Sequence, residues 1–471
     1  MSKFKVPTAY TILLIIIILV AGLTWLIPAG EYDRLEDGGP IPGTYHLTEA
    51  NEQGAGDVLL ASFEGFYDAV DIALFILVVG GFLGVVMKTG AINAGIVNVI
   101  QKLNGREKRL IPILMILFGL GGTTFGMWEE TIAFFPLLIP IFIAAGYDSL
   151  VAVAVILLGA GMGTLASTVN PFATGIASGF AGISMGDGIL VRLGMLVILE
   201  AIAIWFVMGY AARIKKDPSR SWVADHMEEH REHFLALNSD QEISQDTVLT
   251  RSQKWTLTLF GLTFLVMIYA VIPFDELGVP LLPALGWWFP ELSALFFTSA
   301  VIIGLFARLK EEELTDGFVN GAADLLGVAF IIAISRGITV IMNNGLITDT
   351  ILHWGENFLT GAGALSFSFF TYLIYLVLSI FIPSSSGLAT LSIPIMAPLG
   401  DFAGVGRDVV ITAFQAASGL VNLITPTSAV IMGALTLGRI SYDRWFKFSW
   451  KFLVAIFVLS AAVIVASAMI S

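Results

Sequence analysis

The stretch ETIAFFPLLIPIFIAAGYDSLV, residues 130–151, has a second copy later in the chain, LATLSIPIMAPLGDFAGVGRDVV, at residues 388–410. Each copy carries two prolines four residues apart, followed five residues later by an Ala-Gly pair. A polar break ending in proline comes next in each copy, STVNP at 167–171 and NLITP at 422–426. This matched spacing predicts an internal repeat; the alternative is chance similarity between two apolar stretches of low complexity.

The composition indicates a membrane protein that crosses the bilayer many times. Of the 471 residues, 56% are hydrophobic and 13% are charged, and many apolar runs are long enough to span a bilayer as a helix. Residues 7–28 form one such run, and a cleaved signal peptide is the competing interpretation. The run is too long for that, and no small-residue cleavage site follows it. The sequence has no cysteine, which excludes disulfides and thiolate metal sites, and its net charge of −13 argues against nucleic acid as a partner.

The distribution of Lys and Arg predicts the topology, because basic residues concentrate on the cytoplasmic side. We expect a cytoplasmic N-terminus, an external loop at 31–57, a cytoplasmic loop at 213–253 and an external C-terminus. The predicted spans are 7–28, 66–87, 189–211, 254–273, 290–307, 318–342 and 446–470.

Segments 110–125 and 131–145 are each too short to span comfortably, which suggests a re-entrant hairpin, and segments 363–382 and 388–402 look like a second one. Segments 110–125 and 131–145 would enter from the cytoplasm and return, and segments 363–382 and 388–402 would enter from outside. Residues 149–183 and 408–438 would be broken helices. The first copy then begins outside and the second inside, which is an inverted-topology repeat. The alternative, in which each arm is a full span, leaves the ends on the same sides, so the charge rule alone does not exclude it.

Four irregular places fall at corresponding positions of the two copies: the tips at 126–130 and 383–387, and the breaks at 167–171 and 422–428. Irregular backbone at membrane depth needs protein or water around it. Packed together, these places would form one site, where helix N-termini suit a carboxylate and free carbonyls and hydroxyls suit a cation. The alternative is that each break merely kinks its helix.

Glu129 and Glu130 are adjacent acids in the first tip, where a charge costs roughly 2.5–3.5 kcal/mol and should face a cavity or a partner. Neighbouring helical residues point about 100° apart, so both face one site only if the tip is unwound. Glu130 is better placed to begin the second arm as a helix-start carboxylate. Glu129 is the favoured cation-binding group, for a substrate ammonium or guanidinium or for a coupling proton. Arg336 would neutralise a glutamate, contact a carboxylate, or pair within the fold, for instance with Asp324.

The candidate substrate-binding residues come from all four places, and we expect no catalytic residue, metal ligand or cofactor apart from Na⁺ or H⁺ as a coupling ion. They are Trp128, Glu129, Glu130, Ser167, Thr168, Asn170, Ser384, Ser385, Ser386, Asn422, Thr425, Thr427 and Ser428. No phosphate-binding loop and no G-x-S-x-G motif is present, which argues against ATP-driven transport and an intramembrane hydrolase. A channel is the other alternative, but an inverted repeat with broken helices favours a secondary active transporter.

Three motifs carry a resemblance to a known family: STVNPFATGIASG at 167–179, PSSSGLATLSIPIMAPLGD at 383–401 and NLITPTSAVIMGAL at 422–435. They resemble the YfcC-like carriers of the C4-dicarboxylate anaerobic carrier (DcuC) group in the ion-transporter superfamily, and the likeness covers nearly the whole chain. The resemblance implies a scaffold domain and a mobile transport domain that work by an elevator movement. It also implies a homodimer, a bacterial inner membrane, and small carboxylates or amino acids as substrates.

The domain boundaries expected from the repeat and the resemblance divide the chain into five parts. They are scaffold helices at 1–109, the first transport half at 110–188, scaffold helices with the cytoplasmic loop at 189–362, the second transport half at 363–438, and a C-terminal helix at 439–471.

The two tips depart from the Ser-Asn-Thr often found in the superfamily, since they read GMWEE and SSS here. This departure weakens the implied dicarboxylate specificity and sodium sites. Acids on one tip and serines on the other suit a zwitterion, with its cationic end at the acids. We therefore expect an amino acid substrate, with a basic amino acid, exchange and proton coupling as open variants. The alternative is a mono- or dicarboxylate driven by Na⁺ or H⁺.

Overall fold

The computed structural model describes residues 8–35, 39–92, 94–95, 98, 106–236, 249–271, 283 and 285–470. These residues are mostly helical, and six of their helices are long and apolar enough to cross a bilayer. The prediction of a helical protein with several membrane-length spans is therefore confirmed. The six are α3 (Val70–Lys88), α9 (Ile189–Lys216), α12 (Phe289–Phe306), α13 (Glu311–Asn344), α15 (Ala364–Phe381) and α19 (Tyr442–Ser467).

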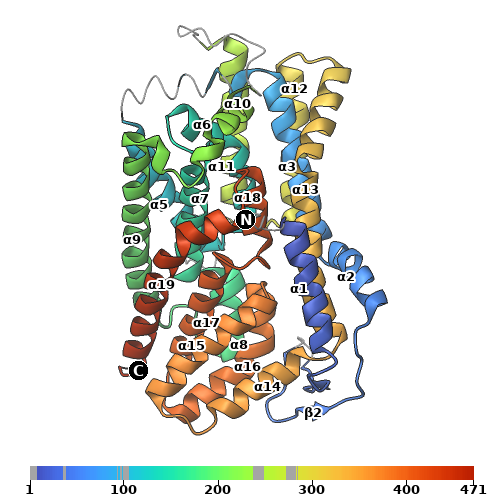
Figure 1. Ribbon diagram of the computed structural model, residues 1–471, viewed down its shortest axis with the longest axis vertical. Coiled ribbons are helices and arrows are strands. Elements are labelled where there is room, and N and C mark those ends of the chain that lie inside the picture. The colour runs from blue at the N-terminus through green and yellow to red at the C-terminus, as the bar shows by residue number, and fades with distance from the viewer. Residues whose placement is uncertain are drawn as a thin grey trace, which may run out of the picture.

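One group of helices, which we call the support body, lies to the right in Figure 1, except for α11, which lies nearer the middle and joins the group through its packing on α12. Helix α13 is its centre, and with 34 residues it is about 50 Å long. Glycines at the crossing of α3 and α13 let the two backbones touch, as small residues do between membrane helices. The group consists of α1 (Ala9–Leu23), α2 (Ala55–Asp68), α3, α11 (Arg251–Val271), α12 and α13.

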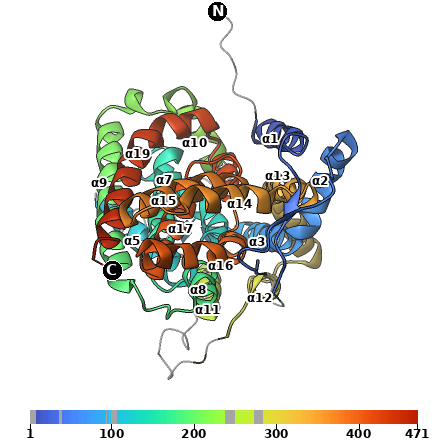
Figure 2. The same cartoon turned by 90° about the horizontal axis from the view of Figure 1, so that it is seen from below.

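The remaining long helices form a second group, the core body, to the left in Figures 1 and 2. Its centre is α7, whose residues are almost all buried, together with α17. Helices α9 and α19 pack against helices of this group, α9 on α5 and α7 and α19 on α15 and α17. The core body consists of α5 (Leu110–Phe125), α6 (Phe135–Ala144), α7 (Ser149–Leu165), α8 (Ile176–Ala181), α9, α14 (Thr348–Leu359), α15, α16 (Ser385–Ala403), α17 (Arg407–Asn422), α18 (Ala429–Leu437) and α19.

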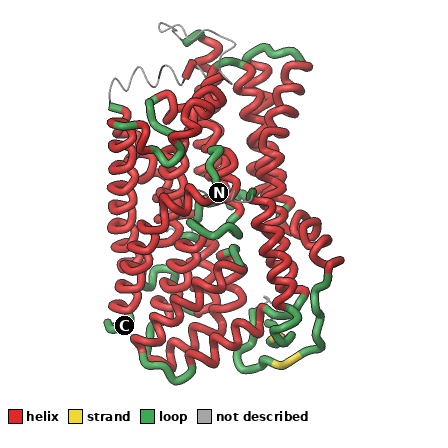
Figure 3. The backbone as a smooth tube through the Cα atoms, in the orientation of Figure 1, coloured by secondary structure: helices red, strands yellow, loops and turns green. Residues whose placement is uncertain are grey.

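Most expected segments coincide with a helix, but several differ from the expectation in length. The expected span 7–28 forms only α1, with 15 residues, and segment 363–382, expected as a hairpin arm, forms α15, which is long enough to cross a bilayer. Segment 66–87 is not one span, because the chain breaks at Ala69 between α2 and α3. Helix α13 begins at Glu311, seven residues before the segment expected from apolar residues alone, since three acidic residues favour its first turn. Both expected breaks occur: α7 ends at Leu165, and α17 ends at Asn422. Figure 3 shows such loop segments at mid-height among the helices of the core body.

Helices α5 and α6 begin and end at the same end of the core body. Lys215, near the end of α9, lies 3.6 Å from Glu107 at the start of α5 and donates a hydrogen bond of 2.7 Å to the carbonyl of Ala145 after α6. The start of α15 and the end of α16 likewise lie together, because Gly400 packs against Phe367. Figure 1 places the ends of these two helix pairs at opposite ends of the core body.

Helices α7 and α17 cross tightly beside the two breaks. A Cβ on Gly161 would lie 2.4 Å from a methyl carbon of Leu423, and a Cβ on Gly419 would lie 2.4 Å from the Cα of Leu165. The two contacts are reciprocal: the glycine of each helix meets the leucine at the end of the other. Gly419 corresponds to Gly161 and Leu423 to Leu165, because each pair is 258 residues apart, the same offset that separates Pro140 from Pro398. Each half of the chain therefore meets the other through the same pair of positions.

Two segments outside the long helices cap the ends of the molecule. At one end, β1 (Gly30–Glu31) pairs antiparallel with β2 (His46–Leu47), and Tyr32 donates a hydrogen bond of 2.6 Å to Glu356 of α14. At the other end, short helices run over the core body, and Asp225 accepts hydrogen bonds of 2.7 and 2.6 Å from Arg444. These are η4 (Pro218–Arg220), η5 (Ala224–His226) and α10 (Met227–Ala236).

Asp148 anchors this second cap beneath the short helices. Its carboxylate accepts hydrogen bonds of 2.6 Å from the hydroxyls of Tyr210 and Ser221, and one of 2.8 Å from the N–H of Val151 at the start of α7. Burial raises the pKa of the Asp148 carboxyl, and the three donors oppose this effect. The cap is thus part of the packed core body and not a freely solvated loop.

Candidate functional site

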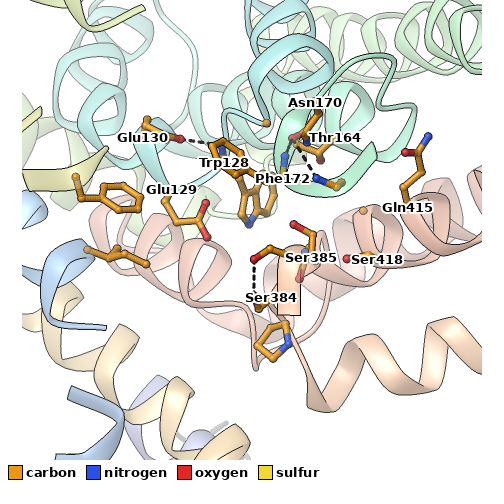
Figure 4. A pocket seen from close by; sticks show the side chains of 18 of the residues that line it. Trp128, Glu129, Glu130, Thr164, Asn170, Phe172, Ser384, Ser385, Gln415 and Ser418 are labelled. Carbon is orange, nitrogen blue, oxygen red and sulfur yellow. Dashed lines mark hydrogen bonds between the residues drawn. The ribbon is translucent and has the colours of Figure 1, made fainter. Parts of the chain in front are cut away.

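The first tip is unwound, which is the condition for two adjacent acids to face one site. Gly126 ends α5 with a φ of +75°, and a 3₁₀ helix, η2 (Glu129–Phe134), replaces the first turn of the second arm. Glu130 is buried, and its carboxylate accepts a hydrogen bond of 3.2 Å from the N–H of Trp128, so it holds the start of η2. The half-buried Glu129 carboxylate lies apart from it, toward the serines of the second tip (Figure 4).

The second tip is a regular helix start. Ser384 is the N-cap of α16, and its hydroxyl accepts a hydrogen bond of 3.2 Å from the N–H of Gly387. The Ser384 and Ser386 hydroxyls lie 3.3 Å apart, and Ser385 extends toward the first tip in Figure 4. Because the first backbone N–H groups of a helix have no partner within the helix, this tip offers donors to an anionic group.

The first break is held by side chains from neighbouring helices. Asn170 accepts hydrogen bonds of 2.9 and 3.3 Å from the N–H groups of Phe172 and Ala173, at the start of the π-helical turn η3 (Pro171–Gly175). Gln415 of α17 donates 2.9 Å to the carbonyl of Ser167, and its own carbonyl accepts 2.7 Å from Thr174. The break is thus tied to both halves of the core body.

The second break is held mainly by its own hydroxyls. The Thr425 and Thr427 hydroxyls lie 2.8 Å apart, and that of Thr427 donates 2.6 Å to the carbonyl of Ile380 at the end of α15. Ser335 of α13 donates a hydrogen bond to the carbonyl of Thr427. This last bond joins the support body directly to the break.

The four places surround one cavity of about 120 Å³, with an adjoining pocket of about 30 Å³. This is room for several water molecules, the scale of a small organic ion. The structure brings ten of the thirteen candidate residues to these walls: Trp128, Glu129, Glu130, Asn170, Ser384, Ser385, Ser386, Asn422, Thr427 and Ser428.

Three candidate residues lie away from both cavities. Ser167 is fully buried in the first break, and Thr168 is bonded to Thr123, whose hydroxyl donates 3.1 Å to it. Thr425 faces Thr427 within its own break. The Thr168 and Thr425 hydroxyls thus bond to groups in or beside the breaks, whereas the Ser167 hydroxyl has no hydrogen-bond partner among the residues that the structure describes.

The support body supplies one wall of the cavity, which the repeat pattern missed. Ile72 comes from α3, Trp288 and Phe289 come from the start of α12, and Arg336 comes from α13. Trp288 also packs against Phe172 of the first break, with ring centroids 4.6 Å apart. Two aromatic residues just before an apolar segment are only a weak indication of a binding site, because aromatic residues also gather where helices meet the membrane surface.

Several polar groups of the core body also line the cavity without having been singled out: Thr164, Gln415 and Ser418. The Ser418 hydroxyl and the Asn422 side-chain carbonyl are buried and have no hydrogen-bond partner among the residues that the structure describes. Their place as polar residues in the otherwise apolar segment 408–438 is the signal that could have identified Gln415 and Ser418. Buried polar groups of this kind are normally satisfied, so they are suited to contact a bound molecule.

Arg336 does not pair with Asp324, which was one of the expected partners. Its Nε lies 3.8 Å from a carboxylate oxygen of Asp68, at the end of α2. The break between α2 and α3 turns Asp68 toward α13, and spacing along the sequence gave no sign of that contact. Arg336 and Glu129 line both the cavity and the adjoining pocket.

A helical membrane body with broken helices around a cavity that is lined in part by polar groups is typical of a membrane transporter. Residues 6–469 match the family model of the C4-dicarboxylate anaerobic carrier (DcuC), and the chain belongs to this family. The resemblance seen in the sequence motifs is therefore confirmed.

Among its relatives, the chain is similar to an uncharacterized protein of Haemophilus influenzae, with 35% identity over 95% of this chain and 94% of that protein. It is 30% identical to a protein of Escherichia coli named "Putative basic amino acid antiporter YfcC", over 98% of this chain and 96% of that protein.

Two solved structures resemble the fold more distantly. The YdaH transporter of Alcanivorax borkumensis matches with a TM-score of 0.42 and 13% identity, over 98% of both chains. MtrF of Neisseria gonorrhoeae matches with a TM-score of 0.45 and 18% identity, over 98% of this chain and 95% of that chain.

Proposed function

We propose that this protein is a secondary active transporter that exchanges small amino acids, in particular basic ones, through the cavity between the two tips. The observation that carries this proposal is the pairing of chemistry across the cavity. Glu129 on one side suits an ammonium or guanidinium group, and the serine-rich start of α16 on the other suits a carboxylate. A zwitterion with a cationic side chain matches both ends at once.

The name of the Escherichia coli relative, a basic amino acid antiporter, supports the same substrate class and the exchange mode. The second candidate function is transport of a mono- or dicarboxylate with Na⁺ or H⁺, which the description of the family favours. For a dicarboxylate, Glu129 would repel the substrate unless a proton or a cation covered it.

The test is counterflow in proteoliposomes. Labelled arginine, lysine and succinate are offered outside vesicles that hold the same unlabelled compound, with and without a Na⁺ or a pH gradient. We expect saturable counterflow of arginine or lysine without any ion gradient. Succinate uptake that requires Na⁺ or H⁺, with no counterflow of basic amino acids, would favour the second function instead.

We further propose that α5–α6 and α15–α16 are re-entrant hairpins and that the two halves form an inverted repeat. The ends of each helix pair lie together, the two pairs reach the cavity from opposite ends, and the crossing of α7 and α17 is reciprocal. A twofold relation between the halves produces reciprocal contacts of this kind.

The same geometry supports an elevator movement, in which the core body carries the site past the support body. Both tips and both breaks belong to the core body, so a rigid movement would carry the substrate contacts together. On packing, we assign α9 and α19 to the moving part, whereas the sequence-based boundaries placed 189–211 in the scaffold and 439–471 apart. A disulfide placed across the two bodies should stop transport, and its reduction should restore it.

The proposed orientation places the N-terminus and residues 213–253 in the cytoplasm and residues 31–57 outside, in a bacterial inner membrane. Because the chain has no cysteine, single introduced cysteines report on this directly. A cysteine at residue 46 should react with an impermeant maleimide in intact cells, and a cysteine at residue 228 should not. The reverse pattern would invert the topology. The homodimer that the resemblance implies is tested by light scattering of the purified protein.

A further inference from the structure

Among the described residues that line the cavity and its adjoining pocket, Arg336 is the one cationic side chain. It lies on α13 of the support body, whereas Glu129 lies on the tip of the core body. The neighbouring residue Ser335 donates a hydrogen bond to the carbonyl of Thr427, so the two bodies touch here. A cation of one body and an anion of the other therefore line the same small cavity at the contact between the two bodies.

The other partner of Arg336 holds it weakly. The distance of 3.8 Å from Nε to the Asp68 carboxylate is beyond hydrogen-bonding range, and the Asp68 side chain is 55% exposed. Ion pairs of this exposed kind contribute little to stability. Only 23% of the Arg336 side chain is exposed. The guanidinium group thus has a loosely held carboxylate of its own body beside it, and it lines the same cavity as the Glu129 carboxylate of the other body.

We propose that Arg336 is an internal counter-ion that enforces exchange, by neutralising Glu129 only while the cavity holds no cationic substrate. This inference rests on the proposed function above. In the empty carrier, attraction between Arg336 and Glu129 holds the core body at the position where the two groups meet. A bound cationic substrate neutralises Glu129, Arg336 returns to Asp68, and the core body is released.

The consequence is that the empty carrier moves slowly and the loaded carrier moves freely, which is the condition for obligatory exchange. A ligand shifts a conformational equilibrium only by its differential affinity for the two states. Here the substrate supplies that difference by replacing a charge pair that exists in one position of the core body. Arg336 then acts through Glu129, as a positioning residue and not as a direct ligand of the substrate.

The test compares uptake of labelled arginine into proteoliposomes with and without unlabelled arginine inside. We expect the wild-type ratio of the two rates to be high and to fall at least about fivefold in Arg336→Gln, the lower end of typical coupling between sites. Arg336→Lys keeps the charge and should keep most of the ratio. Arg308→Gln removes a charge from the same body outside the cavity and should leave the ratio unchanged.

A second variant keeps the proposal testable if Arg336→Gln does not fold. Asp68→Asn removes the alternative partner, so Arg336 should hold Glu129 more tightly and the apparent affinity for arginine should fall. Agmatine has the guanidinium group of arginine but no carboxylate. It therefore distinguishes the counter-ion role from the alternative in which Arg336 binds the substrate carboxylate. If Arg336→Gln weakens arginine binding, spares agmatine and leaves the ratio unchanged, Arg336 binds the substrate carboxylate and the proposal is wrong.

The two proposals fail in different ways. If the wild-type protein transports no basic amino acid, the proposed function fails and this inference fails with it. If the wild-type protein exchanges basic amino acids but Arg336→Gln and Asp68→Asn both behave like it, only the counter-ion role is wrong.

Discussion

The tip at residues 126–130 and the tip at residues 383–387 meet at one cavity but differ in structure and chemistry. The first tip is unwound, turns at a glycine of positive φ and carries two acids. The second is an ordinary helix start, capped by Ser384 and lined by neutral hydroxyls. Only the first tip carries charged side chains, which are costly to place within a bilayer.

This difference shows how two halves with the same proposed backbone arrangement can bind a substrate whose two ends differ. The prolines, the glycines at the α7–α17 crossing and the positions of the breaks agree between the halves. The residues that face the cavity do not agree, since acids on one side oppose serines on the other. A substrate with one cationic and one anionic end fits this arrangement better than a symmetric dicarboxylate.

The largest expected effect comes from the charge of the first tip. Glu129→Gln keeps the size of the side chain but removes the group that would hold the cationic end of the substrate. We expect counterflow of arginine and lysine to be lost, while the protein still inserts and purifies as the wild type does. Wild-type counterflow by this variant would remove Glu129 from the site and with it the chemical contrast between the tips.

The second tip should give a graded loss instead. Ser385→Ala removes one hydroxyl from the cavity wall, and a buried hydrogen bond to a charged group contributes roughly 1.5–3 kcal/mol. The apparent KM for arginine should therefore rise by about 10- to 150-fold, which means weaker binding, with little change in stability. Ser384→Ala should differ from it by also lowering stability by roughly 1 kcal/mol, because it removes the N-cap of α16. An unchanged affinity in Ser385→Ala would place the carboxylate elsewhere.

Matched glycines test the backbone difference between the tips. A Cβ on Gly126 would lie 2.7 Å from both terminal atoms of Asn170, and its φ of +75° is strained for any other residue. We expect Gly126→Ala to lower the free energy of unfolding by roughly 1–3 kcal/mol, measured by thermal unfolding in detergent. At Gly387 an added Cβ meets only the Ser384 side chain, no closer than 3.2 Å. Equal losses in the two variants would contradict the described contrast.

The smallest effect is expected at Glu130, which holds the start of η2 and does not need to meet the substrate. Glu130→Gln keeps an oxygen for the N–H of Trp128 and loses the charge at the helix start. The free energy of unfolding should fall by roughly 0.3–1 kcal/mol, with arginine affinity within about twofold of the wild type. A complete loss of counterflow, matching that of Glu129→Gln, would make the two acids one functional unit.

The sequence predicted the helices and the four irregular places because apolar runs, prolines and polar breaks are local signals. It placed Glu129, Ser385 and Asn170 in a common group, and the structure brings these residues to one cavity. Helix geometry predicted separate tasks for Glu129 and Glu130, but the tip is unwound, so geometry alone does not separate them. The difference lies in the hydrogen bond that Glu130 accepts from the N–H of Trp128.

The sequence did not predict the wall from the support body or the backing of the first break. Ile72 and Trp288 reach the cavity only through the packing of α3 and α12, which no local pattern encodes. Ser167 and Thr168 belong to the break but turn away from the cavity, and their direction depends on Thr123 and Gln415. Arg336 was singled out, but its partner Asp68 is distant in sequence and depends on the break at Ala69.

A structure with bound arginine tests the central claim most directly, because it locates both ends of one substrate molecule. The account predicts the guanidinium group within hydrogen-bonding distance of Glu129 and the carboxylate at Ser385 and the first N–H groups of α16. Density beyond the reach of either tip, or a reversed molecule with its carboxylate at Glu129, would contradict the claim that the two tips form one site with two opposite ends.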